Sequence, residues 1–453
     1  MIDLFAMRVL RWSELDDQAR DDLIARGAAG LPDAAFRDGI KRLVQDVRER
    51  GDAALLDALA RFDDCRLTAA ELRVSPREFT EARAELAPQT RRAIETAIAN
   101  ATRFNEEVLK RQGWMAEIAA GVMVGQRSTP VASAGLFVPG GKASYPSVLI
   151  HLGVPATVAG VPEISVAVPP LPGQGGKVDA AVLVVAEELG IRNVYRVNGP
   201  AGIAALAFGT QTIAKALKIA GPGSPAVVCA QLEAQRSGVD VVVLGPTDSM
   251  VIADSSANPA HVAADLLNEA EHGTDSSSVL LTWDEEFLAQ VQREIGAQFD
   301  ALPSRQRERA AAALGSNGGA VLVRDAEEAS EVANLYAPEH LLVNTSSNPF
   351  IVERITNAGE LLVGGSTPIG MANFTIGIPN SLPTGGLART HSGVTAETFR
   401  KRMATAELSP GGFSVLAAHT IAFAEHEGFP AHAASTHVRL RAANPLAADR
   451  PGR

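Results

Sequence analysis

The 453-residue chain has only two cysteines, Cys65 and Cys229, and no Cys-x-x-Cys spacing. This excludes a disulfide framework, so we expect two reduced, buried thiols in a cytoplasmic protein. Basic residues are also in the minority, and the net charge of -11 argues against a surface for duplex nucleic acid or an anionic membrane.

Long apolar runs are missing as well. Asp3, Arg8 and Arg11 interrupt the N-terminal stretch, so no signal peptide is predicted, and no uncharged run reaches membrane-spanning length. With 46% hydrophobic and 21% charged residues, the composition is that of an ordinary globular protein. The length favours two or three domains. We therefore expect a globular cytoplasmic protein of enzyme size.

The G-x-G-x-x-G fingerprint of dinucleotide-binding folds is absent too. Only the Gly-Pro turns at 199–202 and 221–224 follow predicted strands in a way that could bring backbone amides to a pyrophosphate. Most turns of this kind are simply loops. The sequence therefore permits a nucleotide site without establishing one.

Short apolar runs alternate with helical stretches, which predicts βαβ units and mostly parallel sheets. Residues 34–110 have helical spacing, and residues 395–440 are also expected to be helical. The segment 364–389, rich in Gly, Pro, Asn and Thr, is predicted to be a functional loop. The predicted strands are 164–168, 181–185, 194–197, 239–244, 279–281 and 320–323.

A glutamate and a histidine, Glu269 and His272, stand three residues apart where Gly273 ends a predicted helix. On a helix such residues share a face, so they offer an oxygen and a nitrogen to one zinc ion. A pair with this spacing is more often solvated at the surface. Zinc also needs further ligands, which must come from elsewhere in the chain.

Six motifs, taken together, resemble the histidinol dehydrogenase family over about residues 35–440. In chain order they are Phe137–Gly141, Gly221–Gly223, Glu269–Gly273, Asn334–Leu341, Leu382–Gly386 and Glu427–His432. The fold class expected is α/β, with two Rossmann-like parallel-sheet domains and a helical C-terminal extension. We expect a first α/β domain with the metal and catalytic residues at 1–136 plus 248–394, a nucleotide-binding-like α/β domain at 137–247, and a C-terminal helical dimerisation arm at 395–453.

Members of this family oxidise an amino alcohol through an aldehyde to the carboxylate, a four-electron reaction that depends on zinc and NAD. The resemblance implies that Glu339 and His340 are the catalytic acid/base pair. The chemistry needs such a pair, because the alcohol loses a proton as hydride leaves and a water must be activated against the aldehyde. Seen alone, the pair after Pro338 would be interpreted as a helix cap or a surface pair.

The metal ligands implied by the resemblance are Glu269, His272, Asn373 and His432. The family usually supplies Gln, His, Asp and His, so Glu269 replaces a neutral amide and Asn373 replaces a carboxylate. The summed ligand charge stays at minus one, and zinc accepts both donor types, the amide oxygen more weakly. We expect the metal to be retained. The alternative is that Asn373 only caps a turn and a water completes the site.

Two of the three implied substrate contacts also depart from the family. Thr247 replaces a serine and Asn380 replaces a histidine, whereas Glu427 keeps the acidic contact. Loss of the histidine removes a titratable donor beside the substrate. A substrate other than an imidazole-bearing amino alcohol therefore stays open.

The implied NAD contacts have changed as well. Phe137, Ala201 and Ser224 stand where the family has Tyr, Gln and Asn. Phe137 can pack against a ring system but cannot donate a phenolic hydrogen bond, and it also fits the description of a core aromatic. The histidines without a matched position, His151 among them, are expected to be surface or structural residues.

The sequence predicts a zinc-dependent, NAD-linked dehydrogenase that converts a primary alcohol to a carboxylate, as L-histidinol to L-histidine. It leaves open another small alcohol or polyol, such as a dihydroxypropane sulfonate, removal of two or four electrons, and NAD or NADP. A non-catalytic ligand-binding relative is the alternative, and a zinc structural protein fits poorly because cysteine ligands are absent. By analogy with the family we expect a homodimer in which Glu427 and His432 serve the partner's site, with no nucleic-acid or membrane partner.

Overall fold

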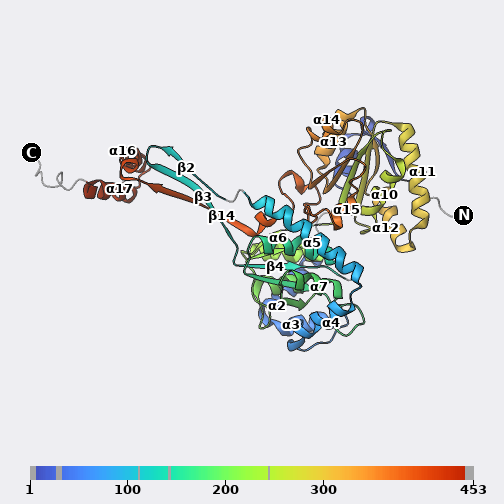
Figure 1. Ribbon diagram of the computed structural model, residues 1–453, viewed down its shortest axis with the longest axis horizontal. Coiled ribbons are helices and arrows are strands. Elements are labelled where there is room, and N and C mark those ends of the chain that lie inside the picture. The colour runs from blue at the N-terminus through green and yellow to red at the C-terminus, as the bar shows by residue number, and fades with distance from the viewer. Residues whose placement is uncertain (1–6, 27–32, 111–112, 141–143, 243–244, 444–453) are drawn as a thin grey trace, which may run out of the picture. The chain divides into compact units, whose positions relative to one another are not determined.

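The computed structural model describes residues 7–26, 33–110, 113–140, 144–242 and 245–443. The chain divides into two units, which Figure 1 shows as ribbons: Met1–Val108 with Val131–Phe399, and Leu109–Pro130 with Arg400–Arg453. The first unit contains two parallel sheets covered by helices. The predicted fold class is confirmed. Within the described ranges, no helix combines the length and the apolar character needed to cross a membrane.

One sheet of the first unit has six strands in the order β1-β11-β10-β9-β12-β13, and all neighbours are parallel. The strands are β1 (Val9–Arg11), β9 (Asp248–Ala253), β10 (Ser277–Thr282), β11 (Gly319–Leu322), β12 (His340–Asn344) and β13 (Glu360–Val363). Both faces are buried, which explains the continuous apolar runs in the sequence. Val251 and Ala253 belong to the hydrophobic cluster on one face, whereas Met250 and Ile252 belong to the cluster on the other.

Helices cover both faces of this sheet (Figure 1). The first cluster includes α10 (Pro259–Ala270), α11 (Glu285–Ala301), α12 (Ser304–Gly315) and α15 (Ile369–Phe374). The second cluster includes α1 (Asp17–Ile24), α13 (Ala326–Tyr336) and α14 (Asn348–Val352). The result is a three-layer α/β/α sandwich, in which the sheet forms the middle of the core.

The other sheet has five parallel strands in the order β6-β5-β4-β7-β8. They are β4 (Ser133–Phe137), β5 (Glu163–Val168), β6 (Asn193–Arg196), β7 (Lys218–Ala220) and β8 (Asp240–Val242). Its helices are α2 (Ala34–Arg50), α3 (Asp52–Phe62), α4 (Pro76–Glu85), α6 (Pro146–Val158), α7 (Ala180–Glu188), α8 (Gly199–Phe208) and α9 (Pro225–Arg236).

The helices before residue 137 do not belong to the domain in which the predicted boundaries place them. Val47 of α2 and Leu55 of α3 share a hydrophobic cluster with Ile203 and Leu206 of α8. These helices therefore cover the five-stranded sheet, whereas we had placed residues 1–136 with the other one. Helical spacing shows that a segment has an apolar face, but not which sheet that face meets.

One predicted strand is wrong, because residues 181–185 lie inside α7. The side chain of Asp179 accepts hydrogen bonds from the backbone N–H groups of Ala181 and Val182 and so caps this helix. The helix is almost entirely buried, and a short apolar run of this kind does not distinguish a strand from a buried helix. The other predicted strands correspond to β5, β6, β8, β10 and β11, although residues 243–244 lie outside the described part of the chain.

Helix α5 (Pro88–Leu109) braces the segment that carries Asn373. Asn100 donates a hydrogen bond from Nδ2 to the carbonyl oxygen of Thr375 over 2.8 Å, just after α15. Asn105 accepts one from the backbone N–H of Ala396 over 2.7 Å. The predicted loop at 364–389 is thus partly helical, and α5 contacts it at Thr375 and contacts the chain again after it at Ala396.

The second unit has an antiparallel sheet of β2 (Trp114–Ala119), β3 (Val122–Pro130) and β14 (Arg400–Leu408), followed by helices α16 (Pro410–His426) and α17 (Pro430–Ala443). The expectation of helix throughout 395–440 is wrong at 400–408. That segment pairs with β3, which is remote in sequence, and a local pattern does not reveal such a partner.

Candidate active site

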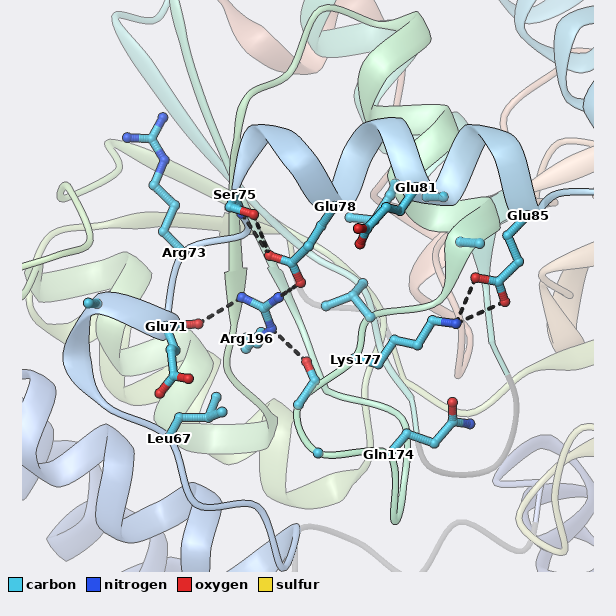
Figure 2. A pocket seen from close by; sticks show the side chains of 17 residues that line it. Leu67, Glu71, Arg73, Ser75, Glu78, Glu81, Glu85, Gln174, Lys177 and Arg196 are labelled. Atoms are coloured by element: carbon cyan, nitrogen blue, oxygen red, sulfur yellow. Dashed lines mark hydrogen bonds and ion pairs between the residues drawn. The ribbon is translucent and has the colours of Figure 1, made fainter.

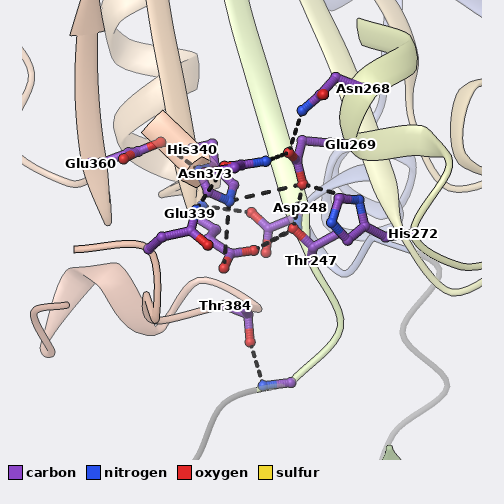
Figure 3. Close-up of polar contacts among 12 residues, drawn as sticks. Thr247, Asp248, Asn268, Glu269, His272, Glu339, His340, Glu360, Asn373 and Thr384 are labelled. Atoms are coloured by element: carbon purple, nitrogen blue, oxygen red, sulfur yellow. Dashed lines mark hydrogen bonds and ion pairs between the residues drawn. The ribbon is translucent and has the colours of Figure 1, made fainter. Parts of the chain in front are cut away.

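Polar side chains from distant segments meet at the amino end of the six-stranded sheet (Figure 3). In an α/β unit the helix runs back along the sheet, so the end of α10 returns to the level at which β9 begins. Ligands of open α/β sheets usually bind beyond the carboxyl ends of the strands, so this cluster lies at the opposite edge. Its members are Thr247, Asp248, Glu269, His272, Glu339, His340, Glu360 and Asn373.

A buried ion pair holds the turn that presents Glu339. Ala337 ends α13 in the left-handed region, with φ 52°, which is unfavourable for a residue with a side chain. Arg26 donates to the carbonyl oxygens of Tyr336 and Ala337 and pairs with Asp248 at 3.2 Å. The other Asp248 oxygen accepts from the backbone N–H of Glu339 over 2.8 Å. These contacts fix the backbone from which Glu339 and His340 project.

Thr247 bridges two buried carboxyl groups. Its Oγ1 lies 2.6 Å from Glu339 Oε2 and 3.0 Å from Glu269 Oε2. A hydroxyl has one proton and cannot donate to both, so one of the carboxyl groups must donate instead. Burial raises the pKa of Glu339 to about 8, with Asp248 and Glu269 acting in the same direction. The raised pKa favours a proton on Glu339, and in that state Glu339 can donate to Thr247 while Thr247 donates to Glu269.

Glu269 is the carboxylate that stays ionised. Burial alone raises its pKa, but the nearby His272 and His340 and the hydrogen bond from Asn373 outweigh burial and leave the pKa lowered. Asn268 adds a 2.7 Å hydrogen bond to Oε1. The residue is thus a buried negative charge surrounded by donors.

His340 is surrounded by acidic groups. Its Nδ1 lies 2.5 Å from Glu360 Oε1, and its Nε2 lies 3.6 Å from Glu339 Oε1 and 3.9 Å from Glu269 Oε2. Burial lowers the pKa of His340, but the three carboxyl groups outweigh burial and raise it to about 10. The carboxyl groups therefore favour the protonated ring, and Nε2 must release its proton before His340 can act as a base beside a reacting hydroxyl.

Three of the four predicted metal ligands come together. His272 Nδ1 lies 3.5 Å from Glu269 Oε2, and Asn373 Nδ2 lies 2.6 Å from Glu269 Oε1. Among the residues that the structure describes, no group of three or more His, Cys, Asp or Glu is placed to hold a metal ion. A zinc ion therefore fits the donor set only with Asn373 as the third ligand, its amide turned so that the oxygen replaces the nitrogen.

The substrate positions divide between the two units. Asn380 donates from Nδ2 to Asn373 Oδ1 over 2.7 Å, so it lies beside Thr247 and the metal ligands as expected. Glu427 follows α16 in the second unit and His432 lies near the start of α17, both exposed. Their predicted roles as substrate contact and metal ligand stay predictions.

The predicted cofactor contacts gather at the carboxyl ends of the five-stranded sheet. Phe137 ends β4, Ala201 lies in the first turn of α8 after β6, and Ser224 precedes α9 after β7. Strand β4 lies between β5 and β7, so the chain changes direction here, which is where open α/β sheets bind ligands. A Cβ on Gly221 (φ 152°) would lie 2.2 Å from the carbonyl oxygen of Phe137, so this close approach requires glycine. Contact with NAD itself stays a prediction.

Two residues near the site were not predicted from the sequence. Glu360 contacts His340, and the available signal was a carboxylate at the start of the short apolar run that forms β13. His151 of α6 lies with Nε2 3.1 Å from the carbonyl oxygen of Asn373. Burial lowers the pKa of His151 to about 4, and the charge of His340 adds to this. His151 is therefore a neutral, buried hydrogen-bond donor, in agreement with the structural role expected for it.

A cavity of about 490 Å³ lies elsewhere in the first unit, beside α4 (Figure 2). Four of its charged side chains form two ion pairs: Arg196 binds Glu78, and Lys177 binds Glu85 at 2.7 Å. None of the predicted site residues lines it. We interpret these pairs as contacts that hold α4 against the end of β6 and against the loop after β5.

Asp265, one turn before Glu269, provides a test of how burial of a carboxyl group near the site affects stability. Burial raises its pKa from 3.8 to about 6. Because the folded pKa is the higher one, the stability that Asp265 contributes is present below about pH 4 and is lost as the pH rises through 6. Asn at this position can still accept the hydrogen bond from Ile369 N–H. We expect Asp265→Asn to raise the free energy of unfolding by up to about 3 kcal/mol at pH 8 and to change it little at pH 4.

Urea unfolding at the two pH values measures this difference. Asp300→Asn, at an exposed position on α11, is the matched control and should have no pH-dependent effect. A gain of equal size at pH 4 and pH 8 would contradict the role assigned to the Asp265 charge.

Comparison with known proteins assigns this chain to a family. A sequence profile described as histidinol dehydrogenase matches residues 30–440. A histidinol dehydrogenase homolog from Colwellia psychrerythraea is 39% identical over 440 residues, which are 96% of this chain and 97% of the relative. A histidinol dehydrogenase from Synechocystis sp. is 37% identical over 434 residues, 95% of this chain and 99% of that one.

A solved structure agrees with the sequence comparison. The crystal structure of histidinol dehydrogenase from Elizabethkingia anophelis superimposes with a TM-score of 0.91 at 33% identity, and covers 97% of this chain and 99% of its own. The similarity therefore extends over both parallel sheets and the C-terminal segment.

Proposed function

The chain belongs to the histidinol dehydrogenase family of oxidoreductases, and on this basis we propose that it oxidises a primary alcohol through an aldehyde to a carboxylate in a zinc-dependent, NAD-linked reaction. The observation that carries the proposal is the buried cluster of Glu339, His340 and Glu269, with Thr247 between the carboxyl groups. Ionisable groups are buried this closely mainly where proton transfer is needed. A non-catalytic relative would have no need of them.

L-Histidinol is the first substrate to consider, and a different small alcohol or polyol, such as a dihydroxypropane sulfonate, is the second. Relatives named histidinol dehydrogenase and relatives named homolog match this chain about equally well, so identity does not choose between them. Asn380 favours the second candidate, because its amide binds Asn373 and it has no ionisable nitrogen with which to recognise an imidazole.

Glu269, His272, Asn373 and His432 would hold the zinc ion, which supplies Lewis acidity that lowers the pKa of the substrate hydroxyl. The crevice at the carboxyl ends of β4, β6 and β7 would hold NAD, which accepts the electrons.

His340 and Glu339 have separate tasks in the proposed reaction. His340, once Nε2 has released its own proton, takes the hydroxyl proton at this nitrogen, which faces the cluster, as the alcohol is oxidised. Glu339, once it has lost its own proton, takes a proton from the water that attacks the aldehyde. Thr247 Oγ1 lies within hydrogen-bonding distance of both Glu339 and Glu269, so its hydroxyl links the proton on Glu339 to a second carboxyl group.

Metal analysis and a substrate screen test this proposal together. The full-length protein should contain zinc and should reduce NAD with at least one alcohol of a panel that includes L-histidinol and dihydroxypropane sulfonate. Parallel assays with NADP in place of NAD show which of the two cofactors the protein uses. Tight binding of an alcohol without NADH formation from any member of the panel would favour the non-catalytic alternative.

We also propose that the protein is a homodimer in which the second unit of one chain completes the site of the other. This unit has few buried apolar residues and exposes large ones, including Trp114, Ile118 and Phe423, with 56%, 66% and 69% of their surface accessible. A small unit that exposes several large apolar side chains and buries few is the kind of surface that a second copy of the chain would cover. A second copy of the chain also allows Glu427 and His432 to act in a partner's site.

Phe423→Ser is expected to weaken the dimer at least about 30-fold, which corresponds to about 2 kcal/mol for an apolar interface residue. Activity per chain should then fall on dilution over the range in which sedimentation shows dissociation. Phe62→Ser on α3 in the first unit, where the side chain is 59% exposed, is the matched control. Full activity in a sample shown to be monomeric would refute the shared site.

A further inference from the structure

Glu360 lies behind His340, on the side away from Glu339 and Glu269 (Figure 3). Its Oε1 is 2.5 Å from His340 Nδ1, and both side chains are only 3% exposed. The other imidazole nitrogen, Nε2, is the one that faces the cluster. The two ring nitrogens thus have different environments, one toward a single carboxylate and one toward the site.

The sheet itself enforces this contact. His340 and Glu360 are register partners at the first positions of the parallel strands β12 and β13, so both side chains project from the same face. Gly359 permits the close approach, because a Cβ there would lie 2.6 Å from the carbonyl oxygen of Glu339. The backbone N–H of Glu360 donates to that same oxygen over 2.9 Å. The backbone of Glu360 is therefore held against Glu339, the residue that precedes His340.

The second oxygen of Glu360 has no hydrogen-bond partner among the described residues, although it is buried. A buried carboxylate with a single hydrogen bond is costly, and in the described part of the chain His340 is the partner that its side chain has. A residue placed only for stability would be replaced by a neutral side chain without loss. The arrangement therefore indicates a task that depends on His340.

We propose that Glu360 is a positioning residue that keeps a proton on His340 Nδ1, so that Nε2 is the only nitrogen of the ring able to take the substrate proton. This inference rests on the proposed dehydrogenase function and extends it to a residue that acts through His340. When the hydroxyl proton moves to Nε2, the Nδ1 proton stays in place and the imidazolium forms against the Glu360 carboxylate. No proton is transferred to Glu360. Its charge stabilises the product of the proton transfer and its geometry fixes the ring.

Kinetics of variants at this position are the first part of the test. Glu360→Gln keeps the size of the side chain but loses the charge, and its amide can donate to Nδ1 and so reverse the tautomer. We expect kcat to fall about 100-fold or more with KM changed less than about threefold. Glu360→Asp, which keeps the carboxylate, should recover part of the loss. Glu353→Gln, at an exposed position after α14, is the control and should behave as wild type.

The second part of the test measures directly, in the full-length protein, which nitrogen of the His340 ring carries a proton. In protein labelled with 15N-histidine, the His340 signals are assigned by their absence from His340→Gln, and wild-type Nδ1 should carry a proton at the pH of the assay. A proton on Nε2 alone in wild type, or a kcat of Glu360→Gln within about threefold of wild type, would overturn the proposal. If no alcohol is oxidised, the proposed function fails while the spectrum still decides the role of Glu360. If Glu360→Gln does not fold, the wild-type spectrum decides it alone.

Discussion

His340→Asn is expected to lower kcat about 1,000-fold or more, with a much smaller change in KM. A general base of this kind contributes about 100- to 10,000-fold, and here no second imidazole is placed to replace it, since His151 donates to the Asn373 backbone and His272 faces Glu269. Asn fits within the volume of the imidazole and can still accept or donate a hydrogen bond toward Glu360. Steady-state NADH formation, at saturating alcohol and cofactor, measures the loss.

Glu339→Gln is the informative comparison for this variant. Gln can still hydrogen-bond to Thr247 and to the backbone of Asp248, so the fold of the turn is preserved. If Glu339 activates the water, this change should affect the second oxidation more than the first, and an aldehyde trap should collect the intermediate. A His340→Asn enzyme with more than about a tenth of wild-type kcat would contradict the assignment of the base.

The sequence predicted the parallel sheets because central strands are buried on both faces and therefore appear as continuous apolar runs, as Val279 to Leu281 do. The same property made α7 look like a strand, because a helix that is buried all round has no amphipathic period. Strand β14 was missed for another reason. Its partner β3 lies almost 300 residues earlier, and no local pattern encodes that pairing.

The candidate site could be predicted in its residue types but not in its proton arrangement. Glu339 and His340 are adjacent in the sequence, yet the pKa of each depends on carboxyl groups that only the fold brings near. Glu360 shows the limit most clearly. It is 20 residues from His340 in the chain, and only the register of β12 against β13 makes the two neighbours. Likewise, Asn373 was interpreted as a ligand from its position alone, whereas the structure shows its amide bound to both Glu269 and Asn380.

Glu269 and Asn373 carry a carboxylate and an amide where the family has an amide and a carboxylate. The second large effect is expected when these two groups are changed. Glu269→Gln removes the only carboxylate among the four predicted ligands and is expected to weaken zinc binding about 100-fold or more, or about 3 kcal/mol. Asn373→Asp has the opposite effect on charge. In the metal-free protein it places a carboxylate where an amide nitrogen now lies 2.6 Å from Glu269 Oε1, so the two charges repel in a buried site. We expect a loss of about 3 kcal/mol or more in the free energy of unfolding without metal.

The double variant Glu269→Gln with Asn373→Asp should then bind zinc within about tenfold of wild type, because it restores one carboxylate and one amide in exchanged positions. The metal-free double variant should also recover the stability that Asn373→Asp alone loses, since Gln can donate to the new carboxylate. Zinc affinities from competition with a chelator, and urea unfolding after metal removal, complete this double-mutant cycle. Two independent sites would give additive effects. Strong non-additivity in both measurements would show that Glu269 and Asn373 share one ion, whereas additive zinc affinities would mean that Asn373 only supports the turn and is not a ligand.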